Sequence, residues 1–273
     1  MSQVKPAGKH AMIDAHVHVF LQDMPLVPNP RHAPVYSFTV AQLIDILDAH
    51  GVDKAVIAAA SPWGDYNDYV IKSVRQHPAR LRGTIIADPA KINAHEMREM
   101  DRDGICGVRL PFISLKELPD LNSWDYRKFL RRIADLDWHV HLHIEGERLP
   151  AVLPALLSQG VKVVVDHIGR LGPQDGVDSA GFVAMAQAIE KRRTWVKLSG
   201  AYRLHASARD QARSLCERVG YDRMFWASDC PFVGCETTVS YPQTIDWLTE
   251  TIPETARRQQ VFHDNAQAFY FGR

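Results

Sequence analysis

The chain has 273 residues, with 32 Lys and Arg against 32 Asp and Glu, so its formal net charge is zero when its 13 histidines are neutral. A neutral chain that is 46% hydrophobic excludes an intrinsically disordered protein, and it lacks the basic excess typical of nucleic-acid binders. At this length about three quarters of the unfolded chain's surface can be buried, which allows one large α/β barrel or two ordinary domains.

Short apolar runs rich in β-branched residues alternate with longer helical segments along the whole sequence. The predicted strands are Met12–Val19, Lys54–Ala59, Arg82–Ala87, Ile105–Pro111, His139–Ile144, Val161–Asp166, Thr194–Ser199 and Met224–Ser228. The predicted helices are Val40–His50, Asp65–Gln76, Ile92–Arg102, Trp124–Leu136, Leu149–Ser158, Gly181–Lys191, Ser207–Val219, Tyr241–Thr251 and Glu254–Phe269. This alternation is typical of βαβ units on a parallel sheet that is buried on both faces.

Eight such units predict a single (β/α)8 barrel, a TIM barrel, over residues 1–273. The competing topology is a doubly wound open sheet, but that fold usually has fewer strands, and no GxGxxG fingerprint follows the first strand. No linker or low-complexity segment divides the sequence, so we expect one domain.

Cysteine usage and the N-terminal sequence indicate the compartment. Cys106, Cys216, Cys230 and Cys235 form no CxxC pair, which predicts neither a disulfide scaffold nor a zinc ribbon. The first six residues lack the apolar segment of a signal peptide, and no apolar run approaches the ~18–20 residues that span a bilayer. We therefore expect a cytoplasmic protein without nucleic-acid or membrane partners, and a homodimer stays open.

Polar side chains gather where the predicted strands end, the edge at which barrel enzymes carry their active sites. His16 and His18 are two residues apart, so strand alternation places them on the same side. We expect them to meet His167 and Asp229, which follow the sixth and eighth strands, with His143 of the fifth strand beside them. The remaining candidates are interpreted as hydrogen-bonded core or surface residues: His10, His32, His50, His77, His95, His139 and His141.

Three or four imidazoles with one carboxylate suit Zn²⁺ or a similar metal that keeps a position open for water. The predicted cofactor is one divalent ion, Zn or Mn, and its ligands would be His16, His18, His143, His167 and Asp229. A carboxylate beside a water molecule is also a general base in its own right, so a metal-free mechanism stays open.

Positive charge follows the fourth, sixth and seventh strands, as Arg109, Arg170 and Arg203. An arginine can bind a carboxylate through two parallel hydrogen bonds, which indicates a small anionic substrate. Salt bridges at the rim of the barrel would place cations at the same positions, and this alternative stays open for the arginines and for Lys197 of the seventh strand.

Six motifs follow one another in chain order at the predicted strand ends and near the C-terminus. They are Ile13-Asp-Ala-His-Val-His18, Gly107-Val-Arg-Leu110, Asp166-His-Ile-Gly-Arg170, Trp195-Val-Lys-Leu-Ser-Gly200, Trp226-Ala-Ser-Asp-Cys-Pro231 and Asn265-Ala-Gln-Ala-Phe-Tyr-Phe271. Together they resemble the amidohydrolase superfamily, specifically its branch of 2-pyrone-4,6-dicarboxylate lactonases and sugar lactonases. The resemblance implies a barrel hydrolase that opens the lactone ring of a pyrone-dicarboxylate-like, muconolactone-like or sugar-acid substrate.

The resemblance also implies roles for single residues. Asp229 would activate water, and His16, His18 and His167 would polarise the lactone carbonyl, directly or through a metal. The residues that would bind or border the substrate are Ser61, Arg109, His143, Arg170, Tyr202 and Arg203. His143 stands where the pyrone-dicarboxylate lactonase has a tyrosine, which favours a metal. The stretch after Arg109 lacks a second arginine that the dicarboxylate would need, and Lys116 is the residue there that could substitute for it.

Two other functions fit parts of this pattern. A metal-dependent decarboxylase or hydratase of an aromatic-derived acid resembles a neighbouring branch with the same barrel and a similar aspartate. A non-catalytic barrel that binds a carboxylated ligand is the third hypothesis, and the intact set of His16, His18, His167 and Asp229 argues against it.

Overall fold

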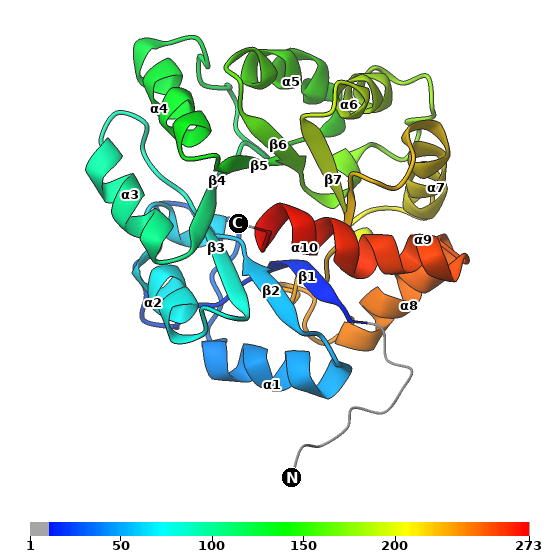
Figure 1. Cartoon of the computed structure of the whole chain (residues 1–273), viewed down its shortest axis with the longest axis horizontal. Helices are drawn as coiled ribbons and strands as arrows, with labels where there is room; N and C mark the ends of the chain where they lie inside the picture. Colours follow the sequence, from blue (N-terminus) through cyan, green and yellow to red (C-terminus); the bar gives the residue numbers. More distant parts are fainter. Residues whose placement is uncertain (1–10, 273) are drawn as a thin grey trace.

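The structure is a computed structural model that describes residues 11–272, so the predictions for His10 and for the N-terminal sequence before it lie outside the described residues. Eight parallel strands form one sheet in the order β1 to β8, and helices surround it (Figure 1). The predicted TIM barrel is confirmed, since the sheet curls into a barrel with its helices outside.

The strands alternate with the helices as the sequence pattern predicts. The strands are β1 (Ile13–Val17), β2 (Lys54–Ile57), β3 (Leu81–Ile85), β4 (Ile105–Pro111), β5 (His139–His143), β6 (Lys162–Val165), β7 (Thr194–Leu198) and β8 (Met224–Trp226). The helices are α1 (Val40–His50), α2 (Asp68–Gln76), α3 (Ala94–Arg102), α4 (Trp124–Asp135), α5 (Leu149–Ser158), α6 (Ala180–Glu190), α7 (Ala208–Val219), α8 (Tyr241–Thr251), α9 (Thr255–Gln259) and α10 (Asn265–Tyr270).

The structure differs from the predicted boundaries mainly at the ends of elements. Most strands stop one or two residues earlier than predicted, and Asp166, Ser199 and Ser228 belong to the loops that follow them. The predicted helix Glu254–Phe269 is divided by a π-helical turn at Gln260–Asp264. After that turn the Asn265 amide donates to the carbonyls of Tyr221 and Met224, which anchors α10 beside β8.

The barrel closes through residues that follow β8 rather than through β8 itself. The Asp229 amide donates to the carbonyl of His16 at 2.9 Å, and the His18 amide donates to the carbonyl of Cys230 at 2.8 Å. This pairing joins the two ends of the sheet and places Asp229 directly beside the histidines of β1.

A β-bulge in β1 turns the histidines toward the inside of the barrel. Asp14 pairs with Ala55 and Val17 with Ile57, so β1 has one residue more than β2 over this interval. Ala15 packs inside the barrel with side chains from other strands, whereas Asp14 accepts a hydrogen bond from Tyr241 on α8 outside it. Without the extra residue, His16 would share the outward side of Asp14.

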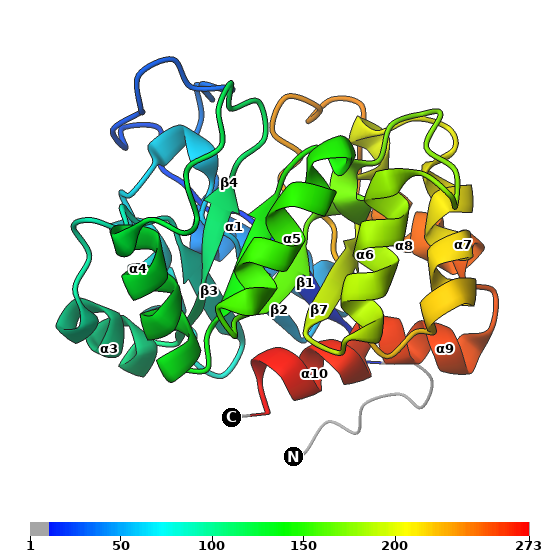
Figure 2. The same ribbon diagram turned by 90° about the horizontal axis from the view of Figure 1, so that it is seen from above.

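The amino end of the barrel is closed by α10, which crosses it in Figure 1 and lies below the strands in Figure 2. The His139 ring packs at 5.2 Å from the rings of both Phe269 and Tyr270. The Tyr270 hydroxyl lies 3.2 Å from Nε2 of His141. Because this end is filled, a substrate has access only from the carboxyl ends of the strands.

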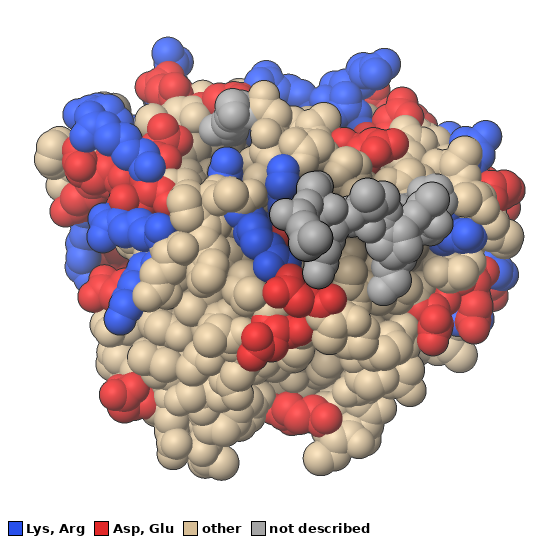
Figure 3. Space-filling view, turned by 60° about the horizontal axis from the view of Figure 1, so that its bottom comes forward, with Lys and Arg blue, Asp and Glu red and all other residues tan. Residues whose placement is uncertain are grey.

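The surface in Figure 3 carries Lys and Arg interspersed with Asp and Glu, and no charge of one sign dominates that face. Between residues 11 and 272, no helix has the length and apolar composition that crossing a bilayer requires.

Asp14 depends on Tyr241, because its carboxyl is fully buried and burial raises its pKa to about 6. Tyr241→Phe removes the 2.7 Å hydrogen bond to Asp14 Oδ2, and we expect the free energy of unfolding to fall by about 1–3 kcal/mol at pH 7. Urea unfolding measures this change. Tyr126→Phe is the control, since its half-buried hydroxyl has no hydrogen-bond partner among residues 11–272. A change below about 0.5 kcal/mol in Tyr241→Phe would contradict the assignment.

Candidate active site

A pocket opens at the carboxyl ends of the strands and contains most of the predicted site. Its lining residues are His18, Arg31, His32, Ala60, Ser61, Pro62, Trp63, Arg109, His143, His167, Arg170, Arg203, Asp229 and Val233. Ser61 belongs to a short 3₁₀ turn after β2, and Arg31 and His32 belong to the Pro-rich loop after β1.

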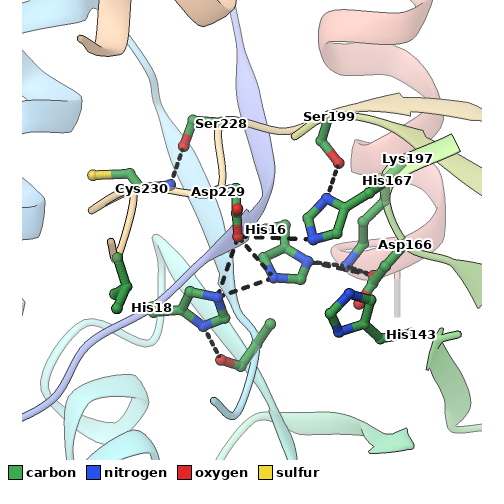
Figure 4. Close-up of polar contacts among 12 residues, drawn as sticks. His16, His18, His143, Asp166, His167, Lys197, Ser199, Ser228, Asp229 and Cys230 are labelled. Carbon is green, nitrogen blue, oxygen red and sulfur yellow. Dashed lines mark hydrogen bonds and ion pairs between the residues drawn. The ribbon is translucent and has the colours of Figure 1, made fainter. Parts of the chain in front are cut away.

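Asp229 lies at the bottom of this pocket, and its two oxygens have different neighbours. Figure 4 shows the carboxylate beside the imidazoles of His16, His18 and His167. Oδ1 faces three imidazole nitrogens, at 3.3 Å from His18 Nε2, 3.5 Å from His16 Nε2 and 3.9 Å from His167 Nε2. Oδ2 accepts hydrogen bonds of 2.7 Å from the Tyr202 hydroxyl and from Arg203 Nε. The carboxylate is therefore held by Oδ2 and presents Oδ1 to the histidines.

The surroundings of Asp229 keep it ionised. Burial alone would raise its pKa, but the surrounding imidazoles and the Arg203 guanidinium outweigh burial and hold the pKa well below the usual value. Its backbone has φ +67°, a left-handed conformation that costs a non-glycine residue about 1–3 kcal/mol. Such strain persists at a position where the surrounding contacts fix the backbone.

His167 begins a run of left-handed residues that ends at Arg170. Its Nδ1 hydrogen-bonds with Ser199 Oγ at 2.9 Å, which turns Nε2 toward Asp229. Burial lowers the pKa of His167 to about 4, so the ring is neutral near pH 7. Gly200 lies directly against this ring, because a Cβ there would approach His167 Nδ1 to 2.7 Å.

A second buried carboxylate, Asp166, lies below Asp229. Its Oδ1 is 3.0 Å from Lys197 Nζ and 3.4 Å from His16 Nδ1, and its Oδ2 accepts from Arg109 Nε at 3.1 Å. These cations hold the pKa of Asp166 well below its usual value against the effect of burial. Burial lowers the pKa of Lys197 to about 8, while Asp166 opposes that shift.

Two arginines of the pocket have no carboxylate of the protein to bind. Within residues 11–272, neither Arg31 nor Arg170 has an ion pair or a side-chain hydrogen bond. The pKa of Arg31 is lowered by burial and then by the guanidinium groups of Arg170, Arg203 and Arg109. The mouth of the pocket therefore carries an excess of positive charge.

The structure brings His16, His18, His167 and Asp229 together, but it gives other predicted site residues different neighbours. Arg109 donates three hydrogen bonds, to Asp166, to the Ala59 carbonyl and to His143 Nδ1.

Tyr202 and Arg203 likewise bind Asp229. Some of the residues that were predicted to bind substrate carboxylates therefore bind the protein's own carboxylates. Sequence reasoning missed Arg31 and His32, whose position in a loop without periodicity gave no signal. For Lys197 it left a rim salt bridge open, and it did not predict the buried contacts with His16 and His141.

Among residues 11–272, two groups of side chains are close enough to hold a metal ion by distance alone: His16 with His167 and Asp229, and His16 with His141 and Asp166. The predicted ligands His18 and His143 belong to neither group. Lys197 Nζ already lies within 3.0 Å of an acceptor atom of each member of the second group. Its donation to His16 Nδ1 leaves hydrogen on His16 Nε2, and a protonated nitrogen cannot ligate a metal. The side chains as arranged do not fit a metal centre that includes His16.

Comparison with known proteins places this geometry in a family. The family model described as Amidohydrolase matches residues 13–272, so the chain belongs to the amidohydrolase family and is a hydrolase. This confirms the family predicted from the motifs.

The chain is similar to two curated enzymes over most of its length. It is 27% identical over 285 residues to the 2-pyrone-4,6-dicarboxylate hydrolase of Comamonas testosteroni, covering 97% of this chain and 91% of the relative. It is 24% identical over 268 residues to the 4-sulfomuconolactone hydrolase of Hydrogenophaga intermedia, covering 94% and 88%.

A solved structure from Acinetobacter baumannii is described as a probable 2-pyrone-4,6-dicarboxylic acid hydrolase with citric acid bound. Its TM-score is 0.89 at 28% identity, covering 95% of this chain and 99% of that one.

Gly200→Ala tests whether the position of His167 matters. The added Cβ displaces the imidazole, and we expect kcat/KM for a hydrolysed lactone to fall by about 10- to 100-fold. Gly160→Ala is the control, because φ is also positive there, +79°, but no atom lies within 4 Å of its Cβ position. Equal activity in the two variants would show that the contact with His167 is unimportant.

Proposed function

We propose that this protein hydrolyses the lactone ring of a small substrate that carries two anionic groups. The observation that carries the proposal is the ionised Asp229, with Oδ1 among three imidazoles, at the bottom of a pocket whose mouth holds the unpaired Arg31 and Arg170. The similar enzymes named for 2-pyrone-4,6-dicarboxylate and 4-sulfomuconolactone support this substrate class, because both names describe anionic lactones.

In the proposed reaction Asp229 is the general base. Water binds at Oδ1, gives a proton to the carboxylate and adds through its oxygen to the lactone carbonyl carbon. The carbon–oxygen bond of the ring then breaks, and Asp229 returns the proton to the departing ring oxygen. Arg203 and Tyr202 keep Oδ2 occupied, so Oδ1 is the oxygen that exchanges the proton.

The neutral imidazole of His143 supplies a hydrogen bond to the oxyanion that develops on the lactone carbonyl. Arg109 donates to His143 Nδ1 at 3.3 Å, so the ring carries its hydrogen on Nε2. That Nε2 is buried and has no hydrogen-bond partner among the described residues. One such donor in a site without water is often worth about 3–4 kcal/mol of transition-state stabilisation.

The mechanism is derived without a metal step, because the side chains do not fit an ion ligated by His16. The Zn or Mn ion of the sequence analysis, the homodimer and the cytoplasmic location stay predictions. The decarboxylase alternative is separated by a direct assay, since a decarboxylase releases CO₂ and a lactonase does not.

Asp229→Asn tests the base. We expect kcat to fall by about 10²- to 10⁴-fold, with substrate binding retained, because the amide cannot accept the proton from water. The assay follows ring opening of 2-pyrone-4,6-dicarboxylate, sulfomuconolactone, muconolactone and sugar-acid lactones. Asp178→Asn, on the exposed surface, is the control. Full turnover by Asp229→Asn would eliminate the proposed mechanism.

Arg170→Ala tests the anion site. A charge-assisted hydrogen bond is worth about 1.5–3 kcal/mol, so we expect KM for a dianionic lactone to rise by about 10- to 100-fold with a smaller change in kcat. The KM of an uncharged lactone should change little, because that lactone has no anionic group to bind to Arg170. Arg131→Ala on α4, which removes an exposed arginine, is the control. Equal losses for charged and uncharged lactones would contradict an anion-binding role.

A further inference from the structure

Lys197 is a fully buried lysine of β7, with 0% of its side chain exposed, and it lies inside the barrel below the pocket (Figure 4). Its Nζ is 2.8 Å from His16 Nδ1, 3.0 Å from His141 Nδ1 and 3.0 Å from Asp166 Oδ1. An ammonium group has three N–H donors and no acceptor. Nζ hydrogen-bonds with the two imidazole nitrogens and forms an ion pair with Asp166 Oδ1, which has no hydrogen-bond partner among the described residues.

This arrangement determines which nitrogen of His16 carries hydrogen. A ring nitrogen that accepts from an ammonium group is unprotonated, so the hydrogen of the neutral His16 ring is on Nε2. His18 has the opposite form, because its Nδ1 lies 2.7 Å from the Ala58 carbonyl, which only accepts. His16 Nε2–H consequently faces two acceptors, His18 Nε2 at 3.2 Å and Asp229 Oδ1 at 3.5 Å.

Asp166 favours the other tautomer of His16, with hydrogen on Nδ1. Its Oδ1 lies 3.4 Å from the same His16 Nδ1, on which it would favour a hydrogen. A histidine that donates from Nδ1 to a carboxylate presents an unprotonated Nε2, which is the arrangement of metal-ligating histidines. Lys197 and Asp166 thus favour different tautomers of one ring.

We propose that Lys197 is a positioning residue that holds His16 with hydrogen on Nε2, so that His16 donates toward Asp229 and His18 instead of ligating a metal. The role of Asp229 as the base of lactone hydrolysis rests on the proposed function. The tautomer of His16 and its effect on metal binding do not depend on that function.

The first test measures the tautomer in the wild-type protein and needs no substitution. Chelator-treated protein labelled with ¹⁵N in its histidine rings is studied by long-range ¹H–¹⁵N NMR, and the His16 signals are those missing in His16→Asn. We expect a protonated Nε2 and an unprotonated Nδ1. A protonated Nδ1 on His16 in the wild type would overturn the proposal.

The second test uses Lys197→Met, which keeps the length of the side chain and removes its donors. With Asp166 as the remaining partner of Nδ1, we expect the hydrogen of His16 to move to Nδ1. We also expect Zn²⁺ to bind about 10- to 100-fold more tightly than in the wild type, measured by competition with a chromophoric chelator. A merely structural role for Lys197 predicts weaker binding, so equal or weaker Zn²⁺ affinity contradicts the proposal.

Lys162→Met is the matched control. Lys162 lies on the adjacent β6, and its Nζ pairs with Asp137 and lies 5.6 Å from the centre of the Phe269 ring, on the α10 side of the barrel. Its substitution should leave the His16 tautomer and the Zn²⁺ affinity unchanged. If no lactone is hydrolysed by the wild type while the NMR and zinc results are as expected, the proposed function fails and the role of Lys197 stands. If lactones are hydrolysed but His16 carries hydrogen on Nδ1, the role of Lys197 fails and the proposed function stands.

Discussion

The burial of two carboxylates inside the barrel is the constraint on which the rest of this structure depends. A carboxylate removed from water is stable only when cations and hydrogen-bond donors surround it. Asp166 has Lys197 and Arg109, and Asp229 has Arg203 and Tyr202. Much of the positive charge at the strand ends is therefore bound to the protein's own acids, and the ligand is left with the arginines that remain unpaired.

The need to surround buried carboxylates with cations and donors also divides the barrel interior into an apolar end and a polar end. Apolar side chains of the strands and the aromatic residues of α10 fill the amino end, while the histidines and carboxylates occupy the carboxyl end. Without bulk water, hydrogen bonds at the carboxyl end are stronger than they would be at the surface. The bulge in β1 supports this division, because it lets Ala15 pack in the apolar layer while the following His16 still faces inward.

Much of this site follows from the sequence, and the exceptions have identifiable physical causes. The spacing of His16 and His18 and the position of Asp229 after an apolar run were sufficient to place them at the mouth. Arg109 and Tyr202 were assigned to a substrate because a sequence does not show which carboxylate a donor reaches. The sequence left Lys197 as a cation that could form a salt bridge at the rim, because it does not show that the strand buries this lysine completely.

The sequence by itself determined the fold class, the order of its elements and the residue types of the site, because apolar periodicity and motif spacing are local properties of the chain. The tertiary structure alone decided which groups pair, since each pairing joins distant positions. Lys197 and His16 are 181 residues apart in sequence, and they meet only because the barrel closes. Their separation in space, 2.8 Å, is what sets the state of the His16 ring.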